Sequence, residues 1–160
     1  MKKLFLLAMT MLAALTAPAA FADSSGTTTV TATVPSTCEI QFIDTVHGDF
    51  STHVTSTTAT GNIAVLCNKD AGYSLSTPTP DSAGRFMLTA ISGTSGATLE
   101  AELRETVTGQ SWGNTDLVGG QGTGQTVYHP FQVIFNPSGG ALPPVGSYSA
   151  NLTIDLTSTF

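Results

Sequence analysis

The sequence predicts an all-β protein, an antiparallel β-sandwich of immunoglobulin type, on three observations. Hydrophobic residues make up 41% of the 160 residues, so a packed core is possible, and charged residues make up only 10%. Threonine is the most frequent residue and serine and glycine are abundant, whereas glutamate and lysine, which a helical bundle would need throughout, are scarce. Nearly every apolar run alternates with period two and is bounded by Gly, Pro, Asn or Asp, which is typical of strands joined by short turns.

Eight segments show this strand pattern, namely residues 27–34, 39–43, 61–67, 72–77, 85–91, 98–107, 126–135 and 147–157. Glycine, serine and asparagine predict loops over residues 92–96, 113–124 and 136–146. Within residues 98–107 helical propensity competes, but Leu99, Ala101 and Leu103 alternate with polar neighbours, which favours a strand. Trp112 precedes a Gly-Asn turn, and we expect it to pack in the core or at a sheet edge rather than to bind a ligand.

The first 22 residues predict a bacterial signal sequence. Lys2 and Lys3 precede a mostly apolar run over residues 4–15, and Ala20-Phe21-Ala22 matches a cleavage site. The run is shorter than the roughly 20 residues that span a bilayer, which favours a cleaved signal over an uncleaved anchor. The net charge of −6 argues against nucleic-acid binding, because phosphate contacts require a basic surface. We therefore expect a soluble exported protein, or one assembled outside the inner membrane.

Cys38 and Cys67 are the only cysteines. Exported proteins meet an oxidising compartment, and the chain has neither a C-x-x-C motif nor a cluster of cysteine and histidine. These observations favour a structural disulfide between Cys38 and Cys67 over a metal site or a redox pair. The bond would close a loop of about 30 residues and contribute roughly 3–4 kcal/mol.

An eight-residue segment near the N-terminus is strongly β-prone. Residues 27–34 place apolar and polar side chains on alternate faces, with Thr28, Val30, Ala32 and Val34 on one face and threonines on the other. Pro35 separates this segment from Cys38 and the rest of the chain. The segment is either the first strand of its own sandwich or a detachable strand that completes a different subunit.

The C-terminal segment has an equally regular apolar face. Its members are Tyr148, Ala150, Leu152, Ile154 and Leu156, with Phe160 in the same register after a break at Ser158. A strand of this kind requires a neighbour on its far side, which the following residues do not supply. A sandwich that lacks its last strand exposes a hydrophobic groove and an open edge, to which a strand from another chain can pair. We therefore expect an incomplete immunoglobulin-like sandwich, completed by a donor strand from another subunit.

No pattern for catalysis or metal binding stands out. His47, His53 and His129 are the only histidines, and their spacing matches no known zinc pattern, so we expect them to be surface loop residues. The chain lacks a G-x-S-x-G nucleophile motif, and "GGQGTG" at 119–124 lacks the lysine and following helix of a phosphate loop. No enzyme activity and no cofactor are predicted.

Several landmarks occur in an order that resembles a known family. They are "STCEI" around Cys38, "HGDF" at 47–50, "GNIAVLC" at 61–67, "GYSLST" at 72–77, "RFML" at 85–88, "SWGN" at 111–114 and "GSYSANLTIDLT" at 146–157. Together they resemble the pilin-like subunits of archaic chaperone–usher pili, grouped with spore coat protein U-like domains. The chain departs from the family at "LEAELRE", where tyrosines are common, and at "VIFNPSGGALPP".

The resemblance implies a structural pilin that polymerises by donor-strand exchange, for surface adhesion and biofilm formation. A periplasmic chaperone would first lend a strand, which an identical or related subunit would replace at an outer-membrane usher, and the fimbria would lie on the cell surface. The organisation would be a signal peptide at 1–22, a donor-strand arm at 23–37 and a pilin-like domain at 38–160. The donor strand would present Thr28, Val30, Ala32 and Val34, and the groove and chaperone-facing final strand would present Tyr148, Leu152, Ile154, Leu156 and Phe160.

The alternative is a secreted monomeric β-sandwich that binds a carbohydrate or another surface ligand. The two interpretations differ in the fate of residues 27–34. Pairing of these residues within their own sandwich favours the monomeric module, whereas an unpaired segment favours the polymerising subunit.

Overall fold

The structure is a computed structural model that describes residues 28–51 and 53–159. The predicted signal sequence lies outside the described residues. The chain divides into two compact units, residues 1–33 and residues 34–160. In the first unit, residues 28–33 form neither helix nor strand, and their side chains are exposed.

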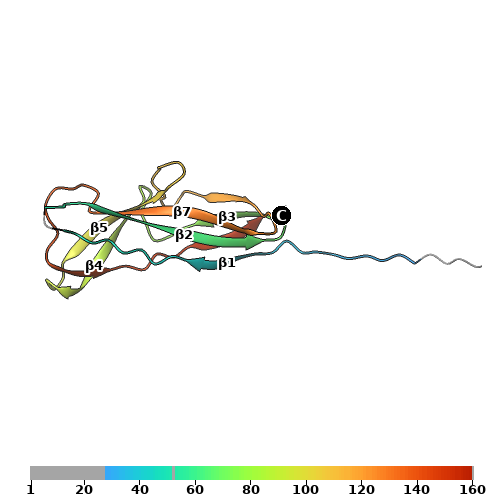
Figure 1. Cartoon of the computed structure of the whole chain (residues 1–160), viewed down its shortest axis with the longest axis horizontal. Helices are drawn as coiled ribbons and strands as arrows, with labels where there is room; N and C mark the ends of the chain where they lie inside the picture. Colours follow the sequence, from blue (N-terminus) through green and yellow to red (C-terminus); the bar gives the residue numbers. More distant parts are fainter. Residues whose placement is uncertain (1–27, 52, 160) are drawn as a thin grey trace, which may run out of the picture. The chain divides into compact units, whose positions relative to one another are not determined.

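The described part of the second unit contains nine β-strands (Figure 1). They are β1 (Cys38–Ile43), β2 (Thr57–Cys67), β3 (Gly72–Ser76), β4 (Arg85–Gly93), β5 (Thr98–Glu105), β6 (Val118–Gln121), β7 (Thr126–Phe135), β8 (Gly146–Ser149) and β9 (Asp155–Thr159). A six-stranded sheet has the order β1-β2-β7-β5-β4-β8, and a three-stranded sheet has the order β6-β3-β9. All of the pairings are antiparallel. Among the described residues there is no helix long and apolar enough to cross a membrane.

The prediction of an all-β fold with antiparallel sheets is confirmed, and the strand at residues 126–135 has the predicted bounds. Two other predictions were wrong. The expected loop at 113–124 contains β6, which pairs with β3. Its sequence, Val-Gly-Gly-Gln, has no alternation, so only the neighbouring strand makes it a strand. The expected single strand at 147–157 is divided into β8 and β9, which belong to different sheets.

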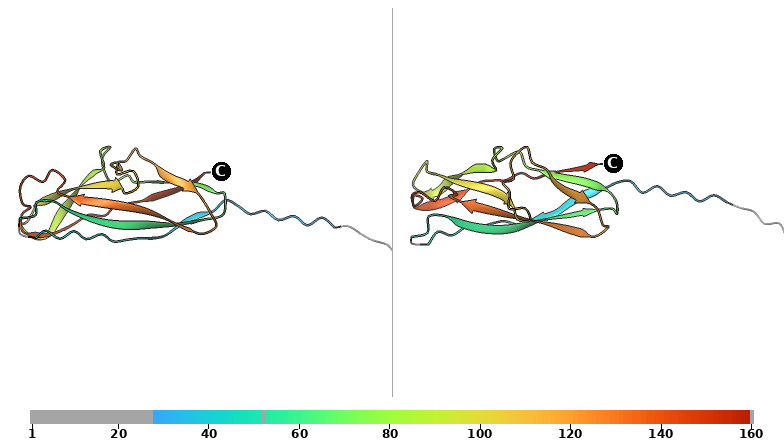
Figure 2. Two further views of the ribbon diagram at one scale, coloured as in Figure 1. Left: turned by 45° about the horizontal axis from the view of Figure 1, so that its top comes forward. Right: turned by 90° about the horizontal axis from the view of Figure 1, so that it is seen from above.

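The core lies between the two sheets, and the longest strands supply most of it. Strands β2 and β7 lie side by side over ten residue pairs, as both views of Figure 2 show. Their inward side chains pack against those of β5 and β3, and the central members are Ile63, Val65, Tyr73, Leu75, Leu103, Phe131 and Val133. Trp112 is only 2% exposed, so the expectation that it packs in the core is confirmed.

A polar pair lies within this apolar interior. The Tyr73 hydroxyl on β3 lies 2.7 Å from Nε2 of His129 on β7, and the two rings meet edge to face. The pair therefore joins the two sheets. Burial lowers the pKa of His129, although the charge of Glu105 partly opposes this effect. His129 is half-buried in a strand, so its expected place in a surface loop was wrong.

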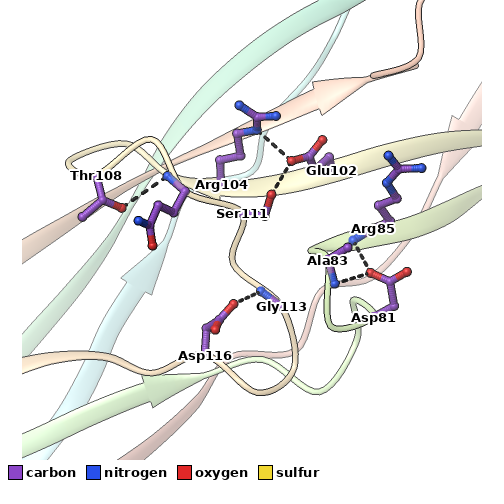
Figure 3. A network of polar contacts seen from close by, with 10 residues as sticks. Asp81, Ala83, Arg85, Glu102, Arg104, Thr108, Ser111, Gly113 and Asp116 are labelled. Carbon is purple, nitrogen blue, oxygen red and sulfur yellow. Dashed lines mark hydrogen bonds and ion pairs between the residues drawn. The ribbon is translucent and has the colours of Figure 1, made fainter.

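A second polar cluster fastens a loop to the outer face of the larger sheet (Figure 3). Glu102 is buried, and it accepts hydrogen bonds from Arg104 Nε at 2.8 Å and from the Ser111 hydroxyl at 2.6 Å. Burial alone would raise the pKa of Glu102, but these hydrogen bonds outweigh it, so the pKa lies below its usual value. Period-two alternation places Glu102 on the outer face, and its burial arises because the loop through Ser111 covers it.

Cys38 and Cys67 are bonded, with an S–S distance of 2.08 Å. They are direct neighbours in the register of β1 and β2. The predicted disulfide is therefore present, and it joins the first strand of the larger sheet to the second at one end of the sandwich, called here the disulfide end.

The disulfide can be checked on protein exported from its host. The intact mass under non-reducing conditions should lie about 2 Da below that of the reduced chain. Reduction should lower the free energy of unfolding by roughly 3–4 kcal/mol, because the unfolded chain loses a cross-link around about 30 residues. Urea denaturation with and without reductant measures this difference. Two free thiols in the exported protein would contradict the assignment.

The buried His129 predicts a loss of stability in acid. In the unfolded chain His129 is protonated near its ordinary pKa of 6.5, whereas in the folded chain its pKa is lowered, so protonation occurs at a lower pH. The stability that neutral His129 contributes is therefore present above pH 6.5 and lost as the pH falls through the lowered pKa. Urea midpoints measured between about pH 7.5 and pH 5 should fall more steeply for the native chain than for His129→Gln. Parallel curves for the two proteins would rule out this role of His129.

Candidate functional site

An open apolar groove lies at the edge of the sandwich. It has a volume of about 290 Å³, and it lies between residues 43–46, at the end of β1, and residues 150–154, between β8 and β9. Core side chains of β4, β5 and β7 form its floor, and these are Phe86, Leu88, Leu103, Phe131, Val133 and Phe135. The groove therefore opens directly onto the hydrophobic core.

The first wall of the groove follows β1. Pairing with β2 ends at Asp44, whose backbone N–H donates to Asn62 O at 2.9 Å and whose carboxylate accepts from the Asn62 backbone and side chain. Beyond this point, Val46, Gly48 and Phe50 are half-buried, while the residues between them are exposed. A Cβ at Gly48 would lie 2.4 Å from the Phe135 ring, so only glycine permits this close approach.

The second wall is the segment between β8 and β9. Leu152 and Ile154 are half-buried and face the groove, whereas Asn151 and Thr153 are exposed. In this segment the Thr153 backbone N–H donates a hydrogen bond to the Thr79 hydroxyl at 3.1 Å. Period-two alternation thus continues through residues 150–154 although they belong to neither sheet.

The division of the predicted final strand has a physical cause. Ser149 in β8 pairs with Thr89 at the edge of the larger sheet, and Asp155 in β9 pairs with Ser76 in the smaller sheet. Residues 150–154 must cross from one sheet to the other, so they cannot keep a partner in either. Peptide groups without ladder partners line the groove as a result, beside a floor of apolar side chains. Such an edge is suited to pairing with an added strand.

The predicted groove residues have different fates. Leu152 and Ile154 line the groove. Tyr148 lies in β8, packs against the core and donates a hydrogen bond to Pro144 O at 2.6 Å. Leu156 lies in β9 opposite Leu75, and Phe160 lies outside the described residues.

The sequence interpretation missed the wall that follows β1. Val46 lines the groove, and it alternates with Gly48 and Phe50 in "TVHGDF", so this period-two pattern could have identified it. The groove floor could not be found in this way, because residues distant in the sequence form it.

The candidate donor residues lie before β1. Residues 28–34 belong to no strand of the structure, and the side chains of Thr28, Val30, Ala32 and Val34 are exposed, Val30 by 87% and Val34 by 76%. Exposed valines in a period-two pattern are an apolar face without a partner.

The other two histidines are exposed. His47 Nε2 lies 3.0 Å from the Asp49 carboxylate, and both side chains are more than 80% exposed. Among residues 28–51 and 53–159, no three side chains of His, Cys, Asp or Glu are grouped so that they could hold a metal ion.

Comparison with solved structures finds a similar fold in a pilus protein complex. The matched chain belongs to the CsuC–CsuE chaperone-tip adhesion subunit pre-assembly complex from archaic chaperone-usher Csu pili of Acinetobacter baumannii. The TM-score is 0.50 at 14% sequence identity, and the match covers 80% of the present chain but only 40% of the other. The two chains therefore share a fold over that region.

A search of the curated proteins finds no match to the chain. The family model of the Spore Coat Protein U domain matches residues 24–155. This range includes the donor-like segment, both cysteines and both walls of the groove. The chain therefore belongs to the spore coat protein U domain family.

Proposed function

We propose that the protein is a structural pilin of a chaperone–usher fimbria, and that it polymerises by donor-strand exchange. The observation that carries this proposal is the groove, because it combines an apolar floor with walls that have unpaired peptide groups. The fold shared with a chain of a Csu pilus complex supports the same class of protein. The donor strand is the segment with Thr28, Val30, Ala32 and Val34, supplied by a neighbouring subunit.

The chemistry of the segment matches that of the groove. Burial of Val30 and Val34 would contribute about 1.5–3 kcal/mol for each side chain, and burial of Ala32 would contribute less. The donor backbone would supply hydrogen-bonding partners to both walls. A shift by one residue would turn threonines toward Phe131 and Val133, so the register should be strict.

The proposed assembly requires partners outside the cytoplasm. Residues 1–22 would direct export, and the disulfide requires an oxidising compartment. A subunit with an open groove would expose its core and pair wrongly with other chains. A periplasmic chaperone would therefore cover the groove until an outer-membrane usher brings the next copy, giving a homopolymer on the cell surface for adhesion and biofilm formation. No catalytic role is assigned to any residue.

A charge in the groove wall should prevent accumulation of the subunit. Ile154→Asp places an unpaired carboxylate against apolar side chains, at a cost on the order of several kcal/mol. Immunoblots of periplasmic extracts from cells that express the chaperone should show loss of the variant by proteolysis.

The matched control is Thr153→Asp, because Thr153 lies next to Ile154 in the same segment but its side chain is exposed. This variant should accumulate normally. Normal accumulation of Ile154→Asp would contradict the assignment of the groove as the site that accepts the donor strand.

The donor segment should act between chains. Deletion of residues 23–34 should leave a subunit that folds with its chaperone but cannot insert into another subunit. A synthetic peptide of residues 25–36 should raise the melting temperature of the truncated subunit, because it binds the folded state.

Two peptide variants separate apolar recognition from nonspecific binding. Val30→Asp with Val34→Asp should abolish the rise in melting temperature, whereas Thr29→Asp with Thr31→Asp, on the opposite face, should preserve most of it. If the truncated subunit is as stable as the full chain and no peptide has an effect, the donor-strand mechanism is wrong. A full chain that also stays monomeric at high concentration would favour the secreted binding module.

A further inference from the structure

The base of the donor segment is held to the disulfide end of the sandwich. Asn68 Nδ2 donates to Pro35 O at 2.8 Å, and the Asn68 backbone N–H donates to Thr37 O at 3.0 Å. The next residue pair is the disulfide between Cys38 and Cys67. One residue after β2 thus fixes both ends of the three-residue connection 35–37.

These contacts determine the direction of the chain before β1. Cys38 lies opposite Cys67, and the hydrogen bond between Thr37 and Asn68 continues this pairing by one residue. Residues 35–37 are therefore held on the β2 side of β1. To enter the groove of its own subunit, the segment would have to turn back along the other edge of β1, which requires these contacts to break.

Strands β1 and β9 lie too close together, where they contact, to admit a strand between them. Cα atoms of β1 and β9 approach within 8 Å of one another, whereas a strand placed between two others requires them to be about 9.5 Å apart. The lining of the groove begins at the last residue of β1, Ile43, and at Ile154, directly before β9.

The length of the connection also places the segment out of register with its own groove. If residues 35–37 formed a hairpin loop, Val34 would lie opposite Cys38 and Val30 opposite Phe42. Both valines would then lie beside β1, and the apolar face would end before the lining of the groove begins at Ile43. A segment from a second copy of the chain is free of this restriction.

We propose that the short connection and its two hydrogen bonds to Asn68 exclude the donor segment from its own groove, so that the occupant of the groove is a second copy of the chain. Asn68 is a positioning residue in this arrangement, because it acts through residues 35–37. The inference rests on the donor-strand function proposed above, and it adds that self-insertion is blocked.

The test lengthens the connection in the full chain. About eight Gly and Ser residues, inserted between Val34 and Pro35, reach about 26 Å and allow the segment to reach residues 43–46 of its own subunit. Four chains are refolded and separated by size-exclusion chromatography: the native sequence, Asn68→Ala, the insertion, and the insertion with Asn68→Ala. A flexible linker gives an effective concentration near the millimolar range, so at about 10 μM subunit the ratio of monomer to polymer should rise roughly 100-fold with the insertion.

Self-insertion has a kinetic signature that a general loss of stability lacks. The monomer of the insertion variant should form at a rate independent of concentration and should melt at a higher temperature than the native monomer. Asn68→Ala should accelerate this step in the insertion variant without changing the disulfide. The matched controls are the same insertion between Gly139 and Gly140, in an exposed loop with open space at Gly140, and Asn114→Ala, on an exposed residue.

The outcomes separate this inference from the proposed function. If the native chain polymerises and the insertion variant polymerises to the same extent at every concentration, the block on self-insertion is refuted. Equal rates with and without Asn68→Ala in the insertion variant would refute the role of Asn68. If the native chain neither polymerises nor responds to the peptide of residues 25–36, the donor-strand function itself fails.

Discussion

The inward side chains of β7 need apolar cover along their whole length, and the two sheets provide it only in part. Phe131, Val133 and Phe135 are buried, yet they also form the floor of the groove between the end of β1 and residues 150–154. The walls beside them keep period-two alternation, but within the described residues β1 pairs only with β2, and residues 150–154 belong to no strand. Apolar surface and unpaired peptide groups therefore occur together, and both are satisfied by one additional strand.

The two ends of the sandwich differ in how firmly they are constrained. At the disulfide end, a covalent bond, the pairing of β1 with β2 and the hydrogen bonds of Asn68 act within a few residues of one another. Beyond Asp44 the chain leaves the ladder, and the groove opens. Residues 35–37 are held at the disulfide end, whereas the lining of the groove begins at the opposite end of β1.

The ion pairs on β4 and β5 lie in the frame of the sandwich and not in the lining of the groove. Arg85 pairs with Glu100 at 3.1 Å across β4 and β5, where exposure to water keeps the contribution small, about 0–1 kcal/mol. Glu102 is different because it is buried, and its hydrogen bonds from Arg104 and Ser111 hold the loop that leads to Trp112. All of the side chains in the floor of the groove are apolar. They match the apolar face of the proposed donor strand, which carries valine and alanine.

The local features of this protein follow from the pattern of its residues. Period-two alternation identified most of the strands, from 39–43 through 126–135, because side chains of a half-buried strand must alternate between core and water. Two cysteines in a chain with a predicted signal sequence indicated the disulfide, and the alternation of Leu152 and Ile154 identified part of the groove wall. For residues 28–34 the pattern left two alternatives open, a strand paired within its own sandwich and an unpaired segment. In the structure these residues belong to no strand.

The choice of partner for each strand depends on contacts between segments that are distant in the sequence. β6 has no pattern of its own and exists because β3 offers an edge, and the final segment divides because its two halves meet different sheets. Glu102 is buried because a loop covers it, and His129, on the same face of β7 as Phe131, meets Tyr73 of the other sheet. Alternation specifies which side of a strand faces inward, whereas sheet order, cover by loops and the closure of β1 against β9 depend on residues far apart in the chain.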